Sequence, residues 1–281
     1  MEMNIIKLNS KAPVIIVDRS YYVFYRYFAT ARWWSFQNPE TGKALLKLTE
    51  QSAFEDAFTK HVYADIDKLQ KRWGLVGKRK KPIAPNNIIF CRDCPRQEIW
   101  RMELYKDYKG TRPINEKFDT YSFTSFSNAR SSADIGTSVG HPKLEADDVA
   151  CLIFRQVRDV MGPDQPVIFI TGDHDYLQLK DDYCEIYSLP DKNLWEAGVK
   201  KGTDNLKRKI VMGDSSDNIP QVLTKSQREL FMAMDGEEQK AYLDKLGKTK
   251  AFELNKTLMC WSCIPEDIVK SFNETYRIEK E

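Results

Sequence analysis

Several marks of membrane and secreted proteins are missing from this chain of 281 residues. It has no apolar run near the ~18 residues that a membrane-spanning helix needs. Its first residues, MEMNIIKLNS, lack the basic-then-apolar pattern of a signal peptide. Internal repeats and low-complexity tracts are also absent. Because 42% of the residues are hydrophobic and 12% aromatic, the composition excludes a disordered chain and allows a sizeable core. We expect a soluble, intracellular protein.

The charge is nearly balanced, with a formal net value of +2, but it is unevenly distributed. Lys and Arg gather in the stretches 71–81, 101–112 and 200–209, whereas Asp and Glu gather in short clusters. Separate basic stretches and acidic clusters suit a protein that binds phosphates and holds cations. For any single stretch, a solvated helix face is the alternative interpretation.

Cysteine usage is compatible with a zinc site but does not favour one. The chain has six cysteines, and without a secretory signal free thiols are the default. Two pairs have the CxxC spacing of zinc ligands, Cys91/Cys94 and Cys260/Cys263. The first pair brackets Asp93 at the end of an apparent buried strand, and the second lies in a helical-looking region. We therefore favour buried cysteines over zinc.

The apolar pattern predicts an α/β fold with a largely parallel central sheet flanked by helices. Continuous apolar runs without alternation are typical of strands buried on both faces, and they occur at 12–18, 86–93, 165–175 and 183–189. Apolar residues recur at helical spacing in 51–73 and 144–160. Strands that alternate with helices indicate a parallel sheet.

Residues 113–143 interrupt this rhythm with a stretch rich in Ser, Thr and Asn, through which Phe118, Tyr121, Phe123 and Phe126 are spaced. The stretch predicts a long exposed excursion with little regular structure. From about residue 204 the chain looks helical to its end. We therefore expect a core of residues 1–203 and a helical region of residues 204–281.

Acidic residues follow the predicted strands. Asp18, Asp93 and Asp173 each come just after an apolar run, and Asp175 follows two residues later. Because the carboxyl ends of parallel strands meet at one edge of a sheet, these side chains are expected to converge. The segments EADD (145–148) and GDSSDNIP (213–220) complete the predicted set, with Glu145, Asp147, Asp148, Asp214 and Asp217.

Such a set of carboxylates predicts bound metal ions. Neighbouring carboxylates raise one another's pKa, so several would stay protonated without cations. Oxygen ligands with no histidine nearby favour Mg²⁺ or Mn²⁺ over zinc. The set is too large for one octahedral ion, and two ions ~4 Å apart form the usual clamp for attack on a phosphodiester. Asp148 and Asp217 could instead serve only as helix or turn caps.

Taken together, the motifs resemble those of a known family. The segments VIIVDRSYYVFYRYFA (14–29), FCRDCPRQEIWRMELYKDYKGTR (90–112), LEADDVA, ITGDHDYLQL and MGDSSDNIP are similar, in this order, to the 5′ nuclease domains of bacterial DNA polymerase I and of phage 5′ exonucleases. The resemblance runs from about residue 14 to 220. Residues 264–276 are more like the RNase H of T-even phages. The family is that of flap endonucleases and 5′→3′ exonucleases.

The resemblance implies a PIN/5′-nuclease-like core and a role for each matching residue. Two Mg²⁺ ions, for which Mn²⁺ can substitute, would be held by Asp18, Asp93, Glu145 and Asp147, with Asp148 close by, and by Asp173, Asp175 and Asp214, with Asp217 in support. Lys109 and Arg112 would be catalytic, contacting the scissile phosphate. Residues 105–140 would form an arch. Contacts to nucleic acid would come from Arg26, Lys106, Tyr108, Lys225 and Arg228, with an internal salt bridge as the alternative for Arg26.

The implied substrates are DNA with 5′ flaps, nicks or ends, or an RNA–DNA hybrid, in replication or repair. We expect a monomer with replication proteins as partners in trans. One segment departs from the family: QVLTKSQREL (221–230) lacks the glycine hairpin that opens the family's helix–turn–helix and often binds potassium. We therefore expect a divergent helix–turn–helix region that binds DNA.

Two other functions fit part of the sequence pattern. A haloacid-dehalogenase-like phosphatase also places an acid at the end of its first strand, but it needs a second acid two residues later, where this chain has Ser20. A nuclease-derived protein that only binds nucleic acid is the other alternative, although none of the metal-binding acids is replaced.

Overall fold

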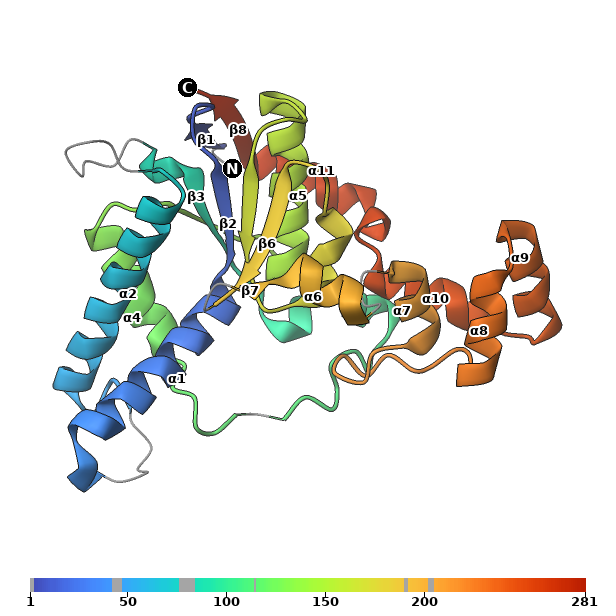
Figure 1. Cartoon of the computed structure of the whole chain (residues 1–281), viewed down its shortest axis with the longest axis horizontal. Coiled ribbons are helices and arrows are strands. Elements are labelled where there is room, and N and C mark those ends of the chain that lie inside the picture. The colour runs from blue at the N-terminus through green and yellow to red at the C-terminus, as the bar shows by residue number, and fades with distance from the viewer. Residues whose placement is uncertain (1–2, 42–46, 76–83, 114, 190–191, 202–204) are drawn as a thin grey trace.

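The computed structural model describes residues 1–281 with the exception of 1–2, 42–46, 76–83, 114, 190–191 and 202–204. Its centre is a six-stranded sheet in the order β4-β3-β2-β5-β6-β7 (Figure 1). All neighbouring strands are parallel except β6 and β7. The strands are β2 (Val14–Asp18), β3 (Ile88–Cys91), β4 (Thr137–Val139), β5 (Val167–Ile170), β6 (Cys184–Ser188) and β7 (Lys192–Asn193).

The strand order places a crevice at the middle of the sheet. From β2 the chain adds β3 and β4 on one side, and it later adds β5 and β6 on the other. In parallel sheets such a change of direction leaves a crevice at the carboxyl ends of the two diverging strands. The predicted strands 12–18, 86–93, 165–175 and 183–189 are confirmed as β2, β3, β5 and β6. The predicted α/β class is confirmed as well.

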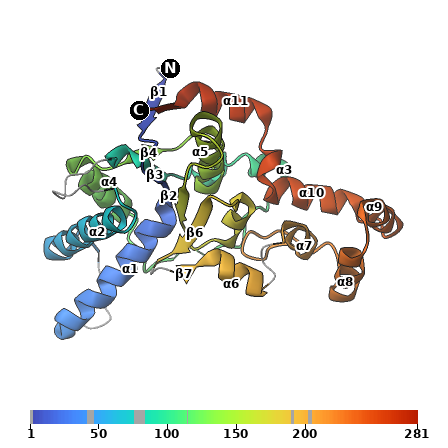
Figure 2. The ribbon, with the colours of Figure 1, turned by 45° about the horizontal axis from the view of Figure 1, so that its top comes forward.

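Helices cover both faces of the sheet (Figure 2). One face packs against α1 (Arg19–Gln37), α2 (Ser52–Arg72) and α4 (Ser122–Ser132) through a core that includes Tyr22, Phe58 and Phe90. The other face packs against α5 (Ala146–Met161) and α11 (Glu266–Thr275). The helices predicted at 51–73 and 144–160 correspond to α2 and α5.

The stretch predicted to be an exposed excursion contains a packed helix, so that expectation is wrong for its second half. Phe126 of α4 is buried, and its ring centroid lies 5.4 Å from that of Tyr22 and 5.1 Å from that of Phe90. Phe118 packs against Phe24 and Tyr27 of α1. Two of the four buried positions of α4 carry serine, so its narrow apolar stripe gave no helical period.

The C-terminal region is helical at first but returns to the core as a strand. Helix α6 (Leu194–Lys201) precedes the predicted boundary, and the region after it contains α7 (Leu206–Met212), α8 (Lys225–Ala233), α9 (Gly236–Lys245) and α10 (Thr249–Met259). Trp261 and Phe272 then join the core around α5. The last strand, β8 (Tyr276–Lys280), pairs in parallel with β1 (Asn4–Leu8), so the expectation of helix to the end is wrong there. Residues 202–204, at the predicted domain boundary, lie outside the described part of the chain.

The remaining elements are short. Helix α3 (Arg101–Leu104) precedes the excursion, and 3-10 turns occur at Pro39–Thr41, Pro85–Asn87, Arg96–Glu98, His174–Leu179 and Trp261–Cys263. Among the helices described, none combines the length and the apolar character needed to cross a bilayer.

The burial of α4 can be tested by truncating its central aromatic side chain. Phe126→Ala should lower the free energy of unfolding by ~3–5 kcal/mol, because the lost ring leaves a cavity between Tyr22 and Phe90. Chemical denaturation would measure the change. Thr124→Ala, at an exposed position of the same helix, is the control and should change stability little. Equal stability of the two variants would show that α4 does not dock on the sheet.

Candidate active site

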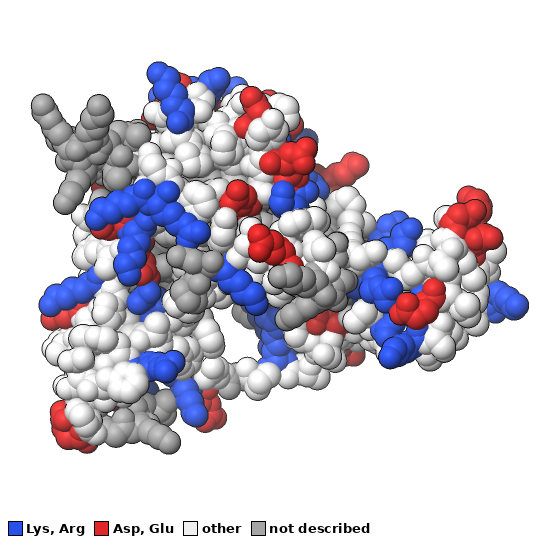
Figure 3. All heavy atoms as spheres, in the orientation of Figure 1, with Lys and Arg blue, Asp and Glu red and all other residues white. Residues whose placement is uncertain are grey.

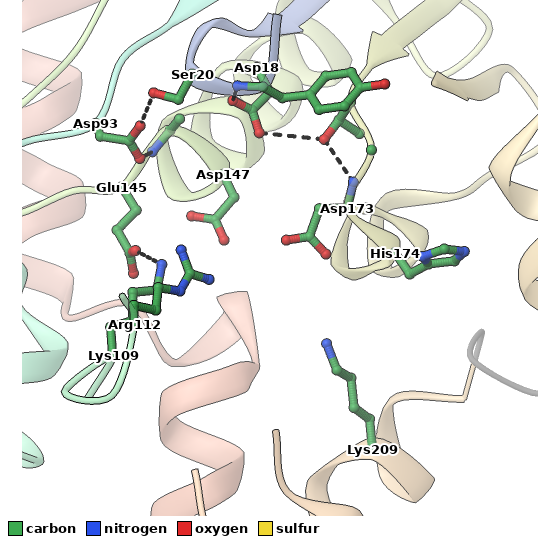
Figure 4. Close-up of a pocket in the computed structure, with 14 residues that line it drawn as sticks. Asp18, Ser20, Asp93, Lys109, Arg112, Glu145, Asp147, Asp173, His174 and Lys209 are labelled. Atoms are coloured by element: carbon green, nitrogen blue, oxygen red, sulfur yellow. Dashed lines mark hydrogen bonds and ion pairs between the residues drawn. The ribbon is translucent and has the colours of Figure 1, made fainter. Parts of the chain in front are cut away.

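A cavity of about 560 Å³ opens at the carboxyl ends of β2 and β5 (Figure 4). It brings together five of the nine predicted metal-binding acids and both predicted catalytic cations. The residues lining it are Asp18, Ser20, Tyr21, Asp93, Lys109, Arg112, Glu145, Ala146, Asp147, Thr171, Gly172, Asp173, His174 and Lys209.

Local backbone geometry positions the acids. Asp18 ends β2 and caps α1, and its carboxylate accepts a hydrogen bond from the Tyr21 backbone N–H at 3.0 Å. Asp93, just after β3, accepts one from the Ala146 N–H at the start of α5, at 2.9 Å. Asp173 caps the 3-10 turn after β5. Capping therefore fixes all three carboxylates toward the cavity.

A glycine lets the first helix approach the third of these acids. A Cβ atom on Gly172 would lie 2.5 Å from the ring of Tyr21, which is closer than any side chain tolerates. The Tyr21 hydroxyl in turn donates to the Leu189 carbonyl oxygen at 3.2 Å. Glycine at this position therefore allows α1 to pack closely against the loop that carries Asp173.

The electrostatics of the cavity call for cations. Burial, reinforced by Asp93 and Asp173, raises the pKa of Asp18 to about 7. Burial and Asp173 raise the pKa of Asp175 to about 6. The pKa of Asp147 is raised well above its usual value by burial, Asp148 and Glu145. These carboxylates can ionise together only if positive charge enters among them, and their oxygens are the donors that hard divalent cations prefer. The residues present therefore fit a divalent metal site.

Two predicted catalytic cations reach the cavity from the segment after α3. The Lys109 side chain bonds Glu145, and its backbone N–H donates to the Asp217 carbonyl oxygen at 2.8 Å. Arg112 donates to the Asp217 carboxylate at 2.5 Å and to the Ser216 carbonyl oxygen at 3.0 Å. Burial alone would raise the pKa of Glu145, but Lys109 and Arg101 lower it. Glu145 is therefore held ionised.

The other predicted acids lie next to the main cavity. Asp175, Asp214 and Asp217 line a much smaller space of about 10 Å³, to which Asp147 also contributes. Lys209 of α7 lines the main cavity, bonds Asp175 and lies 3.3 Å from Asp214. Sequence reasoning missed this residue, because Lys209 stood out only as one cation of a basic stretch.

Asp148 pairs with Arg101 in this structure, and its prediction as a metal ligand stays open. It is 0% exposed, and both carboxylate oxygens accept hydrogen bonds of 2.7 Å from the Arg101 guanidinium. Trp100 Nε1 adds a third bond at 3.0 Å. Its oxygens lie within 4.8 Å of those of Glu145 and Asp147, but Arg101 occupies them. Asp148 and Arg101 therefore hold Glu145 in place, because the Arg101 guanidinium bonds both acids. Sequence reasoning missed Arg101.

Comparison with known proteins settles the family. The family described as 5′-3′ exonuclease, N-terminal resolvase-like domain matches residues 13–210, which is more than half of the chain. The chain belongs to this 5′-3′ exonuclease family. The match also removes the phosphatase alternative.

Two curated relatives of the family are similar to this chain. A 5′-3′ exonuclease of Bacillus subtilis is 25% identical over 224 residues, covering 74% of this chain and 65% of that protein. DNA polymerase I of Pseudomonas aeruginosa is 27% identical over 231 residues, covering 76% of this chain. The chain spans somewhat less than two thirds of the first relative's length and 21% of the second's.

Two solved structures share the fold of this chain. A flap endonuclease of bacteriophage T5, in a complex with DNA and metal ions, superposes with a TM-score of 0.60 at 16% identity, covering 92% of this chain and 96% of that one. A T5 5′-exonuclease with bound zinc gives 0.57 at 17% identity over the same shares. At this identity the likeness establishes the fold alone.

The predicted nucleic-acid contacts of this 5′-3′ exonuclease family member fall into two groups. Tyr108 is 3% exposed, and its hydroxyl bonds the carboxylates of Glu145 and Asp217, so its ring has no free face and the stacking prediction is wrong. Arg26 forms a salt bridge with Asp65, which is the internal alternative. The predictions for three further residues stay open: Lys106 and Lys225 are exposed, and Arg228 is half-buried.

All six cysteines are free thiols. Cys91 is buried in β3, whereas Cys260 and Cys263 belong to the 3-10 turn after α10. Within the described ranges, Glu145, Asp147 and Asp148 are the one group of potential ligands whose atoms lie within 4.8 Å of one another, and it contains no cysteine.

The raised pKa values predict an unusual dependence of stability on pH. With Asp18 near 7 and Asp175 near 6, the metal-free folded protein binds more protons than the unfolded chain between about pH 4 and pH 7. The stability that Asp18 and Asp175 contribute to the folded state is therefore lost as the pH rises through that range. In EDTA, the Tm should fall from about pH 5 to about pH 8, and Mg²⁺ should raise it most at the higher pH, where the carboxylates are ionised.

Asp18→Asn provides the control for this experiment. The amide cannot ionise, so its pH slope in EDTA should be shallower than that of the wild type. Identical slopes for the two proteins would contradict the assignment of the raised pKa to Asp18.

Proposed function

We propose that this protein is a metal-dependent 5′ nuclease that hydrolyses phosphodiester bonds near the 5′ ends of nucleic acids. The observation that carries the proposal is the joint lining of one cavity by five carboxylates, Lys109 and Arg112. The curated relatives are named a 5′-3′ exonuclease and a DNA polymerase I, and the T5 neighbour is named a flap endonuclease. Because the chain spans only part of those relatives, its activity is inferred from its own site.

The donor set suits two Mg²⁺ ions, with Mn²⁺ as a substitute. Asp18, Asp93, Glu145 and Asp147 would hold one ion, and Asp173, Asp175 and Asp214 the other, with Asp217 in support. When bound, such ions activate water and stabilise the charge that develops on the attacking and leaving oxygens. This chemistry leaves a 5′ phosphate and a 3′ hydroxyl without a covalent enzyme intermediate.

The protein's own cations orient the scissile phosphate. Lys109 and Arg112 both line the cavity, and they hold their positions by pairing with Glu145 and Asp217. Lys109 can move its ammonium group from Glu145 to a phosphate oxygen over a short distance, because its backbone is fixed to Asp217. Both side chains then act as preorganised positive charge beside the reacting phosphorus.

A path for a single strand leads away from this cavity. We call residues 115–121 the strap; it precedes α4, and Figure 3 has an opening through the molecule between α1 and the strap. A second groove of about 540 Å³ runs along α1 and shares Tyr21 with the catalytic cavity. Its lining includes Phe24, Phe28 and Arg32, and Phe24 is 42% exposed. Aromatic faces beside a cation suit stacked bases.

The substrates we propose are DNA with 5′ flaps, nicks or ends, or RNA–DNA hybrids, in replication or repair. Duplex contacts are assigned to the helical region after residue 204, where Lys225 and Arg228 lie on α8. We further propose an intracellular monomer that works with replication proteins in trans.

The proposed activity is tested with 5′-labelled flap duplexes of DNA and of RNA–DNA. Wild type should cut near the junction or from the 5′ end with Mg²⁺ and not with EDTA. Asp173→Asn should lower the rate by at least ~10²-fold, because several kcal/mol of charge stabilisation depend on the ions. Asp159→Asn, exposed on α5, should retain the wild-type rate. Tight binding of the flap without cutting in Mg²⁺ or Mn²⁺ would favour a protein that only binds nucleic acid.

The role of Lys109 is tested separately. Lys109→Ala should lower kcat by ~10²–10³-fold, since one preorganised donor to the developing charge is lost. Its Kd for the flap should change much less than kcat. Lys240→Ala, an exposed cation of α9, is the control. Single-turnover cleavage and fluorescence anisotropy measure the two quantities. If Lys109→Ala weakens flap binding but leaves kcat unchanged, Lys109 has no catalytic role.

A further inference from the structure

Three arginines gather just outside the catalytic cavity. Arg19 is the first residue of α1 and follows Asp18, Arg92 precedes Asp93, and Arg130 lies in the last turn of α4. None of the three lines the cavity itself. We call them the arginine cluster. Their place in the chain puts them beside two cavity carboxylates, on the side of the sheet that α4 covers.

Contacts with the protein hold the arginine cluster in place. The Arg19 guanidinium lies 5.0 Å from the ring centroid of Phe123. Arg130 donates to the Gly136 carbonyl oxygen at 2.7 Å. Arg92 packs so closely on Gly140 that a Cβ there would lie 3.1 Å from its Nε. The side chains are therefore preorganised.

The arginine cluster carries more positive charge than its surroundings neutralise. Among the described residues, neither Arg19 nor Arg92 forms an ion pair, and the buried Nε of each has no hydrogen-bond acceptor. Burial and the neighbouring Arg92 lower the pKa of Arg19 to about 10. Burial lowers the pKa of Arg130, and Arg92 adds to the effect.

Two carboxylates act on the arginine cluster, but neither neutralises its positive charge. Asp93 acts on Arg19, yet its oxygens accept hydrogen bonds from Ser20 and from the Ala146 N–H on the cavity side. Asp134 acts on Arg130 and is exposed. Buried donors without acceptors, beside like charges, destabilise the folded state unless an anion binds them.

The chemistry and the position of the arginine cluster select the anion. Guanidinium groups match phosphate oxygens with paired hydrogen bonds. Phe123 and Arg130 lie seven residues apart, about two turns, and so share one face of α4, the helix to which the strap leads. A strand that leaves the cavity past Asp93 meets this face.

We propose that Arg19, Arg92 and Arg130 form a subsite for one backbone phosphate of the nucleic acid, next to the cleavage site and separate from Lys109 and Arg112. The subsite rests on the proposed nuclease function and adds to it. It contributes affinity and direction for the strand on the α4 side, whereas Lys109 and Arg112 act on the bond that is cut.

The first test measures affinity rather than cleavage. A fluorescein-labelled single-stranded DNA is titrated with protein in Ca²⁺ at several KCl concentrations. Arg19→Gln and Arg92→Gln should each weaken binding several-fold and reduce the slope of log K against log salt by about 0.7, the value for one lost phosphate contact on a single strand. Arg277→Gln, an exposed arginine of β8 at the far end of the sheet, should match wild type. Wild-type slopes for both cluster variants would overturn the subsite.

The second test separates binding from a structural role. Because relief of repulsion offsets lost packing, Arg92→Gln should keep the wild-type Tm or exceed it, and pyrophosphate should raise the Tm of wild type more than that of the variant. A lower Tm with an unchanged response to pyrophosphate would show that Arg92 only supports the fold. Neither readout depends on cleavage activity. If the wild type never cuts but the cluster variants reduce the slope, only the nuclease proposal fails. If the wild type cuts but the variants leave the slope unchanged, only the subsite fails.

Discussion

Mutual repulsion among buried carboxylates is the constraint on which the rest of this structure depends. A parallel sheet delivers its strand ends to one edge, and here the edge carries Asp18, Asp93 and Asp173, with Glu145 and Asp147 from the start of α5. The protein's own cations offset part of this negative charge. Arg101 and Lys109 pair with Glu145, and Lys209 pairs with the neighbouring Asp175, whereas the pKa values of Asp18 and Asp147 are raised by burial and by the carboxylates around them. A site in this condition is stabilised by entering cations.

The counter-charges also tie distant segments together. Arg101 lies between the start of α5 and the end of α10: its guanidinium bonds Asp148 and Glu145, and its Nε donates to the Leu258 carbonyl oxygen at 2.7 Å. Gln178, from the turn after Asp173, donates to the next carbonyl oxygen, that of Met259, at 3.0 Å. The helices assigned to duplex binding therefore share hydrogen bonds with the ligand set. Because Arg101 bonds both segments, a shift of α10 would displace the Arg101 side chain and alter its hydrogen bond to Glu145.

The sequence predicted those features that have a local signal. A continuous apolar run followed by an acid identifies β2, β3 and β5 together with Asp18, Asp93 and Asp173, because burial on both faces and the strand end are both visible in a few residues. Helix α4 was missed because two of its four buried positions, Ser122 and Ser125, carry serine and only Phe126 and Ala129 are both apolar and buried. The partnership of Arg101 with Asp148 has no local signal either, since the two residues are 47 positions apart. Pairing of charges across such a distance depends on the fold.

The pairing of β1 with β8 joins the first described strand to the last, with Asn4 opposite Tyr276. On the ribosome, the chain emerges from its amino end, and domains fold as their segments become available. The central sheet can therefore assemble while β1 still lacks its partner, and β1 stays unpaired until residue 280 has been made. Closure of this small sheet therefore comes after the central sheet can form, and Ile278, buried among residues that include Ile6 of β1, makes one of the contacts that complete it.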